Sequence, residues 1–283
     1  MNKNSTKYQV ESSPAIKSST ASYDENYILS NNGILNIYGN CSKKEIEKSL
    51  QEKTKWGITL IQFARQFEVE KELLKLLNEK VLKEFPKCSL RQVLNGYGAF
   101  ENLDFLEHLN NLSDLRIELF GETDLEPINK FCKLKSLAIG GDKSKIEGIT
   151  NHKSIENLFV FDKVKDIKSI GQMKNLKTLT ISKMTLKSLE FLNGLVNLNE
   201  LHFVLGGTKN LGALPKIGRI EELSFTWVRQ LKMEHLIPIN EMKSIKKIKF
   251  NRQPHLLNLD WLNDKEIETE IINCKNFKEE ASR

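Results

Sequence analysis

The sequence predicts an α/β solenoid in which short strands stack into one curved parallel sheet and short helical turns cover its outer side. Two observations predict this fold. From Leu90 to about Phe277, apolar residues keep a fixed spacing that restarts every 21 or 22 residues in most units. Within each unit a strand-like spacing comes first and a helix-like spacing follows. One such unit cannot bury its apolar side alone, so the units must stack on one another.

The segment 176–197 shows the repeat most clearly. Leu176, Leu179 and Ile181 are spaced three and then two residues apart, which is typical of a bend followed by a short strand. Leucines then recur every third residue, which indicates a helical or 3-10 turn with one buried face. We expect the other units to open at Leu90, Leu112, Leu134, Ile155, Leu198, Ile220, Ile245 and Ile267. The first unit departs from the pattern at Asn95, so we expect an irregular or capping repeat there.

The segment 27–89 predicts alternating strands and helices. Short apolar runs on both sides of Gly33 indicate a hairpin or capping strand. A helix over 42–53 begins at Ser42, where Glu45 completes a capping box. A β-prone run occupies 57–63, and the helix expected over 67–85 has the strongest apolar stripe of the chain.

Four parts of the chain follow from this pattern. We expect a disordered leader at 1–26, because it is rich in Ser, Thr, Asn and Lys. A βαβα-like cap at 27–89 is expected to continue into a solenoid at 90–277, which is followed by a tail at 278–283.

The spacing LxxLxI followed by LxxLxxL at a period of 22 residues resembles leucine-rich repeat proteins. It is most similar to the short-repeat class shared by internalin domains and a phosphatase-regulating scaffold. The resemblance implies a parallel sheet on the concave side of an arc and says little about function. The family usually places Asn or Cys eight residues after each unit start. Here these places hold Phe120, Asp142, Lys163, Met184, Gly206, Val228 and Gln253, so we expect no asparagine ladder, and backbone groups or water to pair the bends.

Side chains alternate along a strand, so the residues between the buried positions are expected to face the concave side. Phe159 and Phe161 fall on this face in one unit. Grouped aromatic, Met and Arg side chains are typical of an interface hot spot. The alternative is that they cover the bends or are scattered apolar surface. The predicted partner-binding residues are Arg116, Phe159, Phe161, Thr180, Met184, His202, Val204, Trp227 and Arg229.

A second candidate surface is basic. Lys247, Lys249 and Arg252 lie close together near the end of the repeats and could attract nucleic acid or an acidic partner. The competing interpretation is a solvated edge whose lysines keep the last strands from unwanted pairing. Nucleic acid is the less favoured partner, because the net charge of +6 is small for 283 residues and both signs are interspersed.

Catalytic, metal and cofactor sites find little support in the sequence. The five histidines fall in different units, and His202 has no evident carboxylate or nucleophile beside it. The four cysteines form no CxxC pair and are interpreted as buried thiols of a reducing compartment. We therefore expect a non-enzymatic module without metal or cofactor.

The expected function is protein binding through the concave face. Neither a membrane-spanning run nor a secretory signal is evident, so a cytoplasmic monomer is expected. A toxin-neutralising immunity protein and an intracellular scaffold are both compatible with the sequence.

Overall fold

A computed structural model of the chain describes residues 27–51, 57–63, 67–94, 100, 102–120, 122–141, 145–264 and 266–278. The leader predicted at 1–26, nearly all of the tail predicted at 278–283, Asn95 and Asp142 lie outside these residues.

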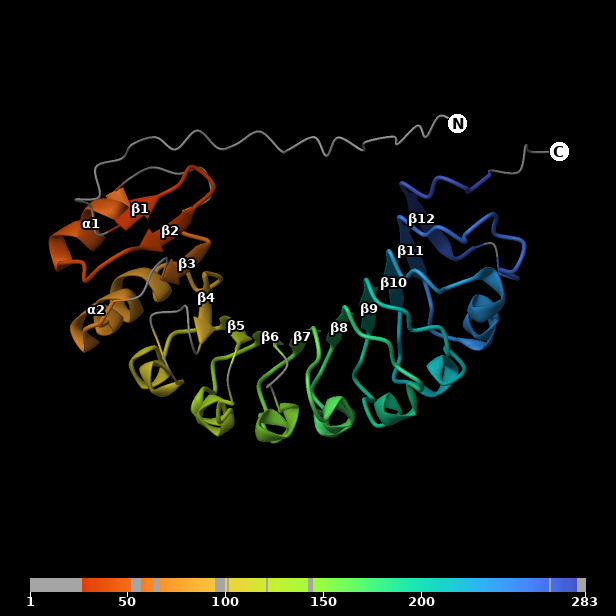
Figure 1. Cartoon of the computed structure of the whole chain (residues 1–283), viewed down its shortest axis with the longest axis horizontal. Helices are drawn as coiled ribbons and strands as arrows, with labels where there is room; N and C mark the ends of the chain where they lie inside the picture. The colour runs from red at the N-terminus through yellow and green to blue at the C-terminus, as the bar shows by residue number, and fades with distance from the viewer. Residues whose placement is uncertain are drawn as a thin grey trace, which may run out of the picture.

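Within the described residues, twelve strands form one sheet in chain order, and this sheet lines the inside of an arc (Figure 1). The first strand pairs antiparallel with the second, and all later neighbours pair parallel. The strands are β1 (Tyr27–Leu29), β2 (Ile34–Ile37), β3 (Leu60–Phe63), β4 (Ser89–Leu94), β5 (Asp114–Leu119), β6 (Ser136–Gly140), β7 (Asn157–Phe161), β8 (Thr178–Ser182), β9 (Glu200–Val204), β10 (Glu222–Thr226), β11 (Lys247–Asn251) and β12 (Glu268–Ile272).

Short helices cover the outer, convex side of the sheet (Figure 1). Two α-helices, α1 (Lys43–Gln51) and α2 (Lys71–Leu76), connect the first strands, and α2 continues into the π-helix η1 (Leu77–Leu82). The later units use 3-10 helices: η2 (Asp104–His108), η3 (Glu126–Lys130), η4 (Ile146–Ile149), η5 (Ile167–Gln172), η6 (Glu190–Leu192), η7 (Leu214–Lys216) and η8 (Met233–Glu241). The predicted α/β solenoid is confirmed. None of the described helices has the length and apolar character needed to cross a membrane.

The N-terminal segment adds strands to the same sheet. The capping box at α1 is present, because the Ser42 N–H donates to Glu45 Oε2 at 2.7 Å and the Glu45 N–H donates to Ser42 Oγ at 3.3 Å. The hairpin turn before β2 contains Gly33 at a φ of 82°, a conformation that glycine adopts without steric cost. The predicted strands and helices of this segment are therefore present, although the helix expected over 67–85 is shorter and runs from Lys71 to Leu82.

The register corrects two of the predicted unit starts. Leu90 pairs with Leu115 rather than with Leu112, so Leu90 fills the second apolar place of its unit. Ile248 pairs with Thr269, which places Ile267 one residue past its predicted place. Both errors occur where a polar residue fills a place that is apolar elsewhere: buried Gln92 on β4 is the register partner of Ile117 on β5.

Each strand from β6 to β11 contributes two inward apolar side chains to a continuous core. In the last units the second of these is aromatic: the rings of Phe203 and Phe225 stack with centroids 5.5 Å apart, and those of Phe225 and Phe250 stack at 5.7 Å. Trp261 meets Phe250 edge-on at 6.2 Å. Stacked rings bury a large apolar area between neighbouring units and tie those units together.

A left-handed residue ends every strand from β6 to β12. The non-glycine members have φ values from 48° to 62°, an uncommon conformation for side-chain-bearing residues. It turns the backbone N–H along the sheet, so that Leu205 donates to the Thr226 carbonyl at 2.7 Å and Trp227 to the Asn251 carbonyl at 2.8 Å. Backbone groups therefore satisfy these bends, as expected without an asparagine ladder.

The last two units partly restore such a ladder, which the sequence prediction missed. Gln253 is buried, and its Nε2 donates to the Phe225 carbonyl at 2.9 Å. Cys274 lies at the same place one unit later, and its Sγ accepts a hydrogen bond from the Gln253 N–H at 3.4 Å. These two side chains bridge neighbouring strands where the solenoid ends.

The cysteine prediction is only partly right. Cys41 and Cys88 are buried, and burial raises the pKa of each thiol to about 12. Cys132 is exposed and Cys274 is half-buried. None of the four forms a disulfide bond within the described part of the chain.

We expect Phe225→Ala to lower the free energy of unfolding by about 3–5 kcal/mol, because it removes the central ring of the stack. Urea unfolding followed by circular dichroism measures the change. Phe120→Ala is the control, since Phe120 is 52% exposed and its loss should shift the free energy of unfolding by only about 0.5 kcal/mol. Equal effects of the two changes would contradict the core assignment.

A second prediction concerns acid stability. His152 is buried, and burial lowers the pKa of its imidazole below the ordinary value of 6.5. Below pH 6.5 the unfolded chain therefore binds a proton on His152 that the folded chain does not bind. The free energy of unfolding consequently falls as the pH drops from 6.5 towards the lowered pKa. Between about pH 7 and pH 5, the free energy of unfolding of the His152→Gln variant should therefore fall less than that of the unchanged protein. His255→Gln is the control, because it removes an exposed histidine instead of a buried one.

Candidate functional site

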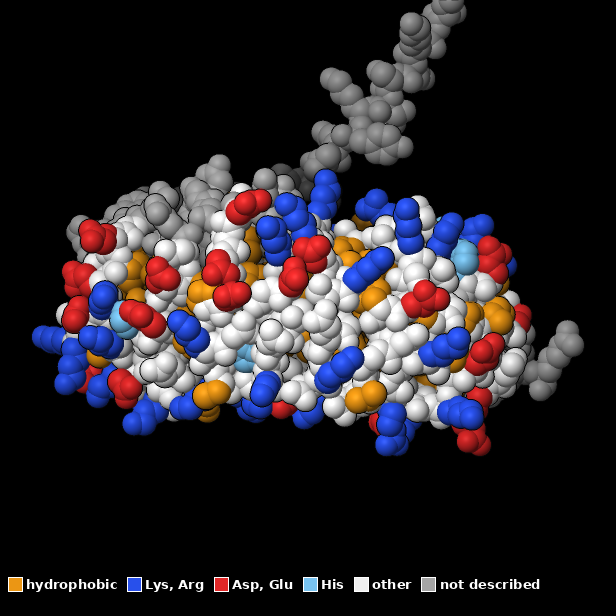
Figure 2. All heavy atoms as spheres, turned by 90° about the horizontal axis from the view of Figure 1, so that it is seen from below, with side chains coloured by type: hydrophobic (Ala, Val, Ile, Leu, Met, Phe, Trp, Pro, Cys, Tyr) orange, Lys and Arg blue, Asp and Glu red, His pale blue; other side chains and the backbone are white. Residues whose placement is uncertain are grey.

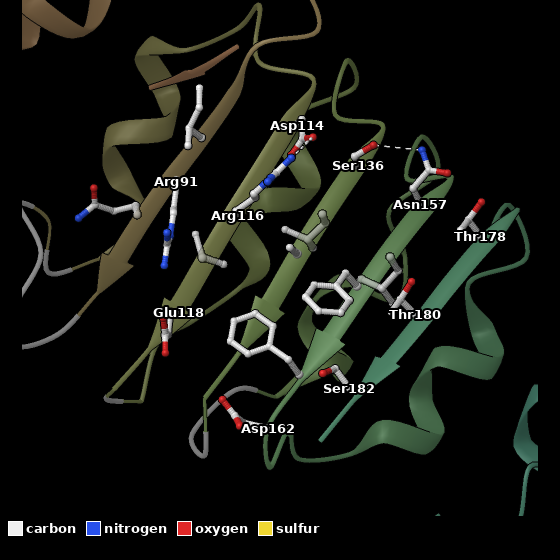
Figure 3. A pocket seen from close by; sticks show the side chains of 18 of the residues that line it. Arg91, Asp114, Arg116, Glu118, Ser136, Asn157, Asp162, Thr178, Thr180 and Ser182 are labelled. Atoms are coloured by element: carbon white, nitrogen blue, oxygen red, sulfur yellow. Dashed lines mark hydrogen bonds and ion pairs between the residues drawn. The ribbon is translucent and has the colours of Figure 1, made fainter. Parts of the chain in front are cut away.

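A hollow of about 620 Å³ lies on the concave face across β4 to β8 (Figure 3). Ala138 on β6 forms the floor of this hollow, and Gly140 follows on the same face of that strand. Both residues are small, while their register partners on β5 and β7 are Arg116, Glu118, Phe159 and Phe161. The sheet itself is regular here, so the hollow exists because β6 lacks large outward side chains.

Two aromatic rings form one wall. Phe159 and Phe161 alternate with buried Leu158 and Val160 on β7, and their rings stack with centroids 5.5 Å apart and an angle of 26° between the planes. Phe161 lies against Gly140 so closely that a Cβ on Gly140 would come within 2.2 Å of the ring. A glycine at this place is therefore required for the ring position.

Two arginines form the opposite wall. Arg91 on β4 and Arg116 on β5 are register partners, and both side chains are exposed (Figure 3). Asp114 binds Arg116, with its two oxygens 3.4 and 3.5 Å from Nε and Nη2. Like charges directly opposite each other on neighbouring strands are destabilising. The two guanidinium groups therefore carry more positive charge than the single carboxylate of Asp114 can neutralise.

Small polar side chains line the rest of the hollow. Asn157 donates to Ser136 Oγ at 3.0 Å, while Thr178, Thr180 and Ser182 place hydroxyl groups along β8 (Figure 3). At the strand exits, Lys183 Nζ lies 3.3 Å from Asp162 Oδ1. The hollow thus combines an aromatic wall, a guanidinium wall and hydroxyl donors, which suits a mixed polar and apolar protein segment.

The predicted partner-binding residues fall into three groups. Arg116, Phe159, Phe161 and Thr180 line the hollow. His202 and Val204 lie on β9 outside it, and half-buried Met184 packs against the core in the bend after β8. Trp227 lies at the strand-exit edge after β10, 41% exposed, with the Arg229 guanidinium carbon 5.2 Å from the centre of its ring. The nine residues are therefore divided: Arg116, Phe159, Phe161, Thr180, His202 and Val204 share the concave face of the strands, and Met184, Trp227 and Arg229 lie in the segments that follow β8 and β10.

The expectation that neither a carboxylate nor a nucleophile lies beside His202 is wrong. Its Nδ1 lies 2.8 Å from Ser224 Oγ, and its Nε2 lies 3.4 Å from Glu200 Oε2. A histidine between a hydroxyl and a carboxylate is an arrangement that hydrolases use. Ser224, however, is a central residue of β10, where its backbone N–H and C=O belong to the sheet ladder and offer no oxyanion hole. The three side chains form a hydrogen-bonded cross-strand cluster.

The basic patch is largely neutralised. Lys247 binds Glu268 and lies 3.5 Å from Glu270, and the hydrogen bond to Glu268 raises the pKa of its ammonium group. Lys249 Nζ lies 2.7 Å from Glu222. Only Arg252 of the three predicted residues has no ion pair in the described part of the chain. This edge therefore presents alternating charges rather than a continuous cationic surface.

Several residues that line the hollow were not predicted from the sequence. Arg91 was hidden because the first unit was aligned three residues away from its true register. Aligning Leu90 with Leu115 reveals it, since an arginine then follows each of these leucines. The sequence prediction also overlooked the outward places where the strands begin, which hold Asp114, Ser136, Asn157 and Thr178.

The convex surface is different in character. Lys, Arg, Asp and Glu side chains are interspersed there, and the apolar areas between them are small and separate (Figure 2). No cluster of three metal-ligating side chains occurs among the described residues of either face.

No protein-family model and no curated protein matches the chain. Among solved structures, an internalin C2 of Listeria monocytogenes is similar over 81% of this chain and 90% of its own, with 16% identity and a TM-score of 0.41. The internalin InlF of the same organism covers 81% and 88%, with 12% identity and a TM-score of 0.37. A chain of the Drosophila Toll–Spätzle complex covers 89% and 44%, with 10% identity and a TM-score of 0.42. The repeat spacing, the parallel register and the 3-10 turns give this chain the leucine-rich repeat fold.

Proposed function

We propose that the chain is a non-catalytic protein-binding module that holds a segment of its partner in the hollow over β4 to β8. The observation that supports this proposal is the stacked Phe159–Phe161 pair, which is half-buried on a concave, strand-lined face opposite two arginines. Aromatic and Arg side chains are the residue types that most often dominate interface energetics. The hollow is wide and open, as expected for a protein segment rather than for an enclosed small molecule.

Two biological roles fit this module. A monomeric cytoplasmic protein of this kind neutralises a toxin by covering its active surface, or acts as a scaffold that leaves its partner active. Both roles use the same hollow and differ in what happens to the partner. An activity assay of the purified partner with and without this protein separates them, because only a neutralising protein abolishes that activity.

The first test uses a photo-crosslinking amino acid in place of Thr180, whose side chain faces the hollow (Figure 3). In the native host we expect a specific protein adduct from this position. The same amino acid at exposed Val196, outside the hollow, should yield no such adduct. Identical adduct patterns from the two positions would contradict the site.

Filling the hollow provides an independent test. Ala138→Phe places a ring on the floor of the hollow without changing its charges, and should reduce the Thr180 adduct at least about tenfold, since a displaced hot-spot contact contributes about 2 kcal/mol or more. Thr226→Phe adds the same ring on the concave face outside the hollow and should leave the adduct intact. Crosslinking yield at matched expression, with circular dichroism to check folding, measures the effect.

The nucleic-acid alternative makes a different prediction. The ion pairs of Lys247 and Lys249 with glutamates leave little free positive charge for phosphates. We expect a fluorescent single-stranded DNA to show no saturable binding even at about 20 mM salt, where phosphate contacts are strongest. Tight binding that weakens steeply with salt and is lost on Lys249→Ala would overturn the choice of a protein partner.

A further inference from the structure

Building on the proposed function, we propose that the hollow recognises a carboxylate two residues away from a large apolar side chain in an extended partner segment. The carboxylate is bound by Arg91 and Arg116, and the apolar side chain stands over Ala138 against Phe159 and Phe161.

The guanidinium wall determines the first half of this recognition. Arg91 and Arg116 are register partners on neighbouring strands, and Asp114 forms an ion pair with Arg116. In the described part of the chain, Arg91 has no ion pair and is exposed to the hollow (Figure 3). A carboxylate between the two would relieve their repulsion and accept paired N–H bonds, which is the geometry that guanidinium groups bind best.

The floor and the aromatic wall determine the second half. Ala138 occupies the same outward row as Arg116 and Phe159, one strand from each. The space above its methyl group is bounded by the Arg116 side chain on one side and by the stacked rings on the other. An aromatic or branched aliphatic side chain fits there and gains ring contacts without displacing a charged group.

The sheet fixes the spacing between the two subsites. Neighbouring strands lie about 4.8 Å apart, so the midpoint between β4 and β5 is about 7 Å from β6. In an extended chain, residues i and i+2 project on the same side and lie about 6.6–7 Å apart. A partner segment that crosses the strands therefore places the carboxylate and the apolar side chain in register only when one residue separates them.

The other charges of the hollow favour a single carboxylate over a polyanion. Asp114, Glu118 and Asp162 also line it, and a chain of phosphates would approach all three. Glu118 lies two residues from Arg116 on the same strand face, and its carboxylate moderately repels any negative charge that is added nearby. A peptide can direct a neutral residue or a backbone N–H towards Glu118, which a phosphate backbone cannot do.

The test is selection of random twelve-residue peptides displayed on phage against the full-length protein. We expect enrichment of Asp or Glu separated by one residue from Phe, Trp, Tyr or Leu. A synthetic peptide carrying the enriched sequence should then lose at least about tenfold in affinity when its acidic residue becomes the amide, and a similar factor when a second residue is inserted into the spacing.

Variants of the protein separate the inference from the proposed function. Arg91→Gln should lower the affinity for the acidic peptide and leave the affinity for its amide form unchanged. Glu118→Gln should raise the affinity for the acidic peptide, because it removes a negative charge that repels the peptide carboxylate. Arg229→Gln is the matched control, since Arg229 lies outside the hollow and packs on Trp227. Thermal unfolding of each variant verifies its folding.

Enriched peptides that require Phe159 and Phe161 but carry no acidic residue would overturn the inference and leave the proposed function standing. Peptides whose binding ignores both aromatic residues, the absence of any enrichment, or preferential binding of an oligonucleotide at low salt would overturn both.

Discussion

Every strand of this sheet depends on its neighbours for its hydrogen bonds and for the burial of its apolar side chains. A parallel strand of five residues cannot satisfy its own backbone, and one row of inward leucines cannot form a core. Stacking in a constant register solves both problems together, as the Phe203, Phe225 and Phe250 rings show where three units meet. The left-handed residues after β8, β9, β10 and β11 belong to the same constraint, because the N–H group of each bonds to the next strand and so transmits the register from unit to unit.

This constraint also determines what the outward side chains can do. Register places one residue of each unit in a common row and separates the rows by a fixed distance, so chemistry on the concave face depends only on which residue fills each place. At β6 the places hold Ala138 and Gly140, and a hollow results. At β9 and β10 they hold His202 and Ser224, and a polar cluster results. At β11 and β12 lysines meet glutamates, and the charges cancel. One backbone therefore carries three different surfaces.

The sequence was sufficient to predict the fold, because the core places repeat and their spacing has a direct structural meaning. Prediction failed where the period was obscured. Gln92 fills a buried place that other units give to Ile, Val or Phe, and the first unit was consequently aligned three residues out of register. The outward residues carry no periodic constraint, so their grouping could be inferred only in part. Phe159 and Phe161 were recognisable because they share one strand, whereas Arg91 required the correct register, and the partners of His202 required knowledge of which side chains lie across the strand.

The features of the hollow that oppose stability support its interpretation as a binding surface. A sheet selected for stability alone would not place Arg91 beside Arg116 on adjacent strands, because like charges in that position oppose each other. Nor would it leave two rings only half-buried beside Ala138, where a larger side chain could cover them. Each feature costs stability in the isolated chain and is relieved by a single kind of occupant, one that brings a carboxylate to the arginines and an apolar group to the rings. The adjacent arginines and the incompletely buried rings lie on neighbouring strands of one otherwise regular sheet. A binding role explains both features at once, whereas a purely structural account would need a separate reason for each.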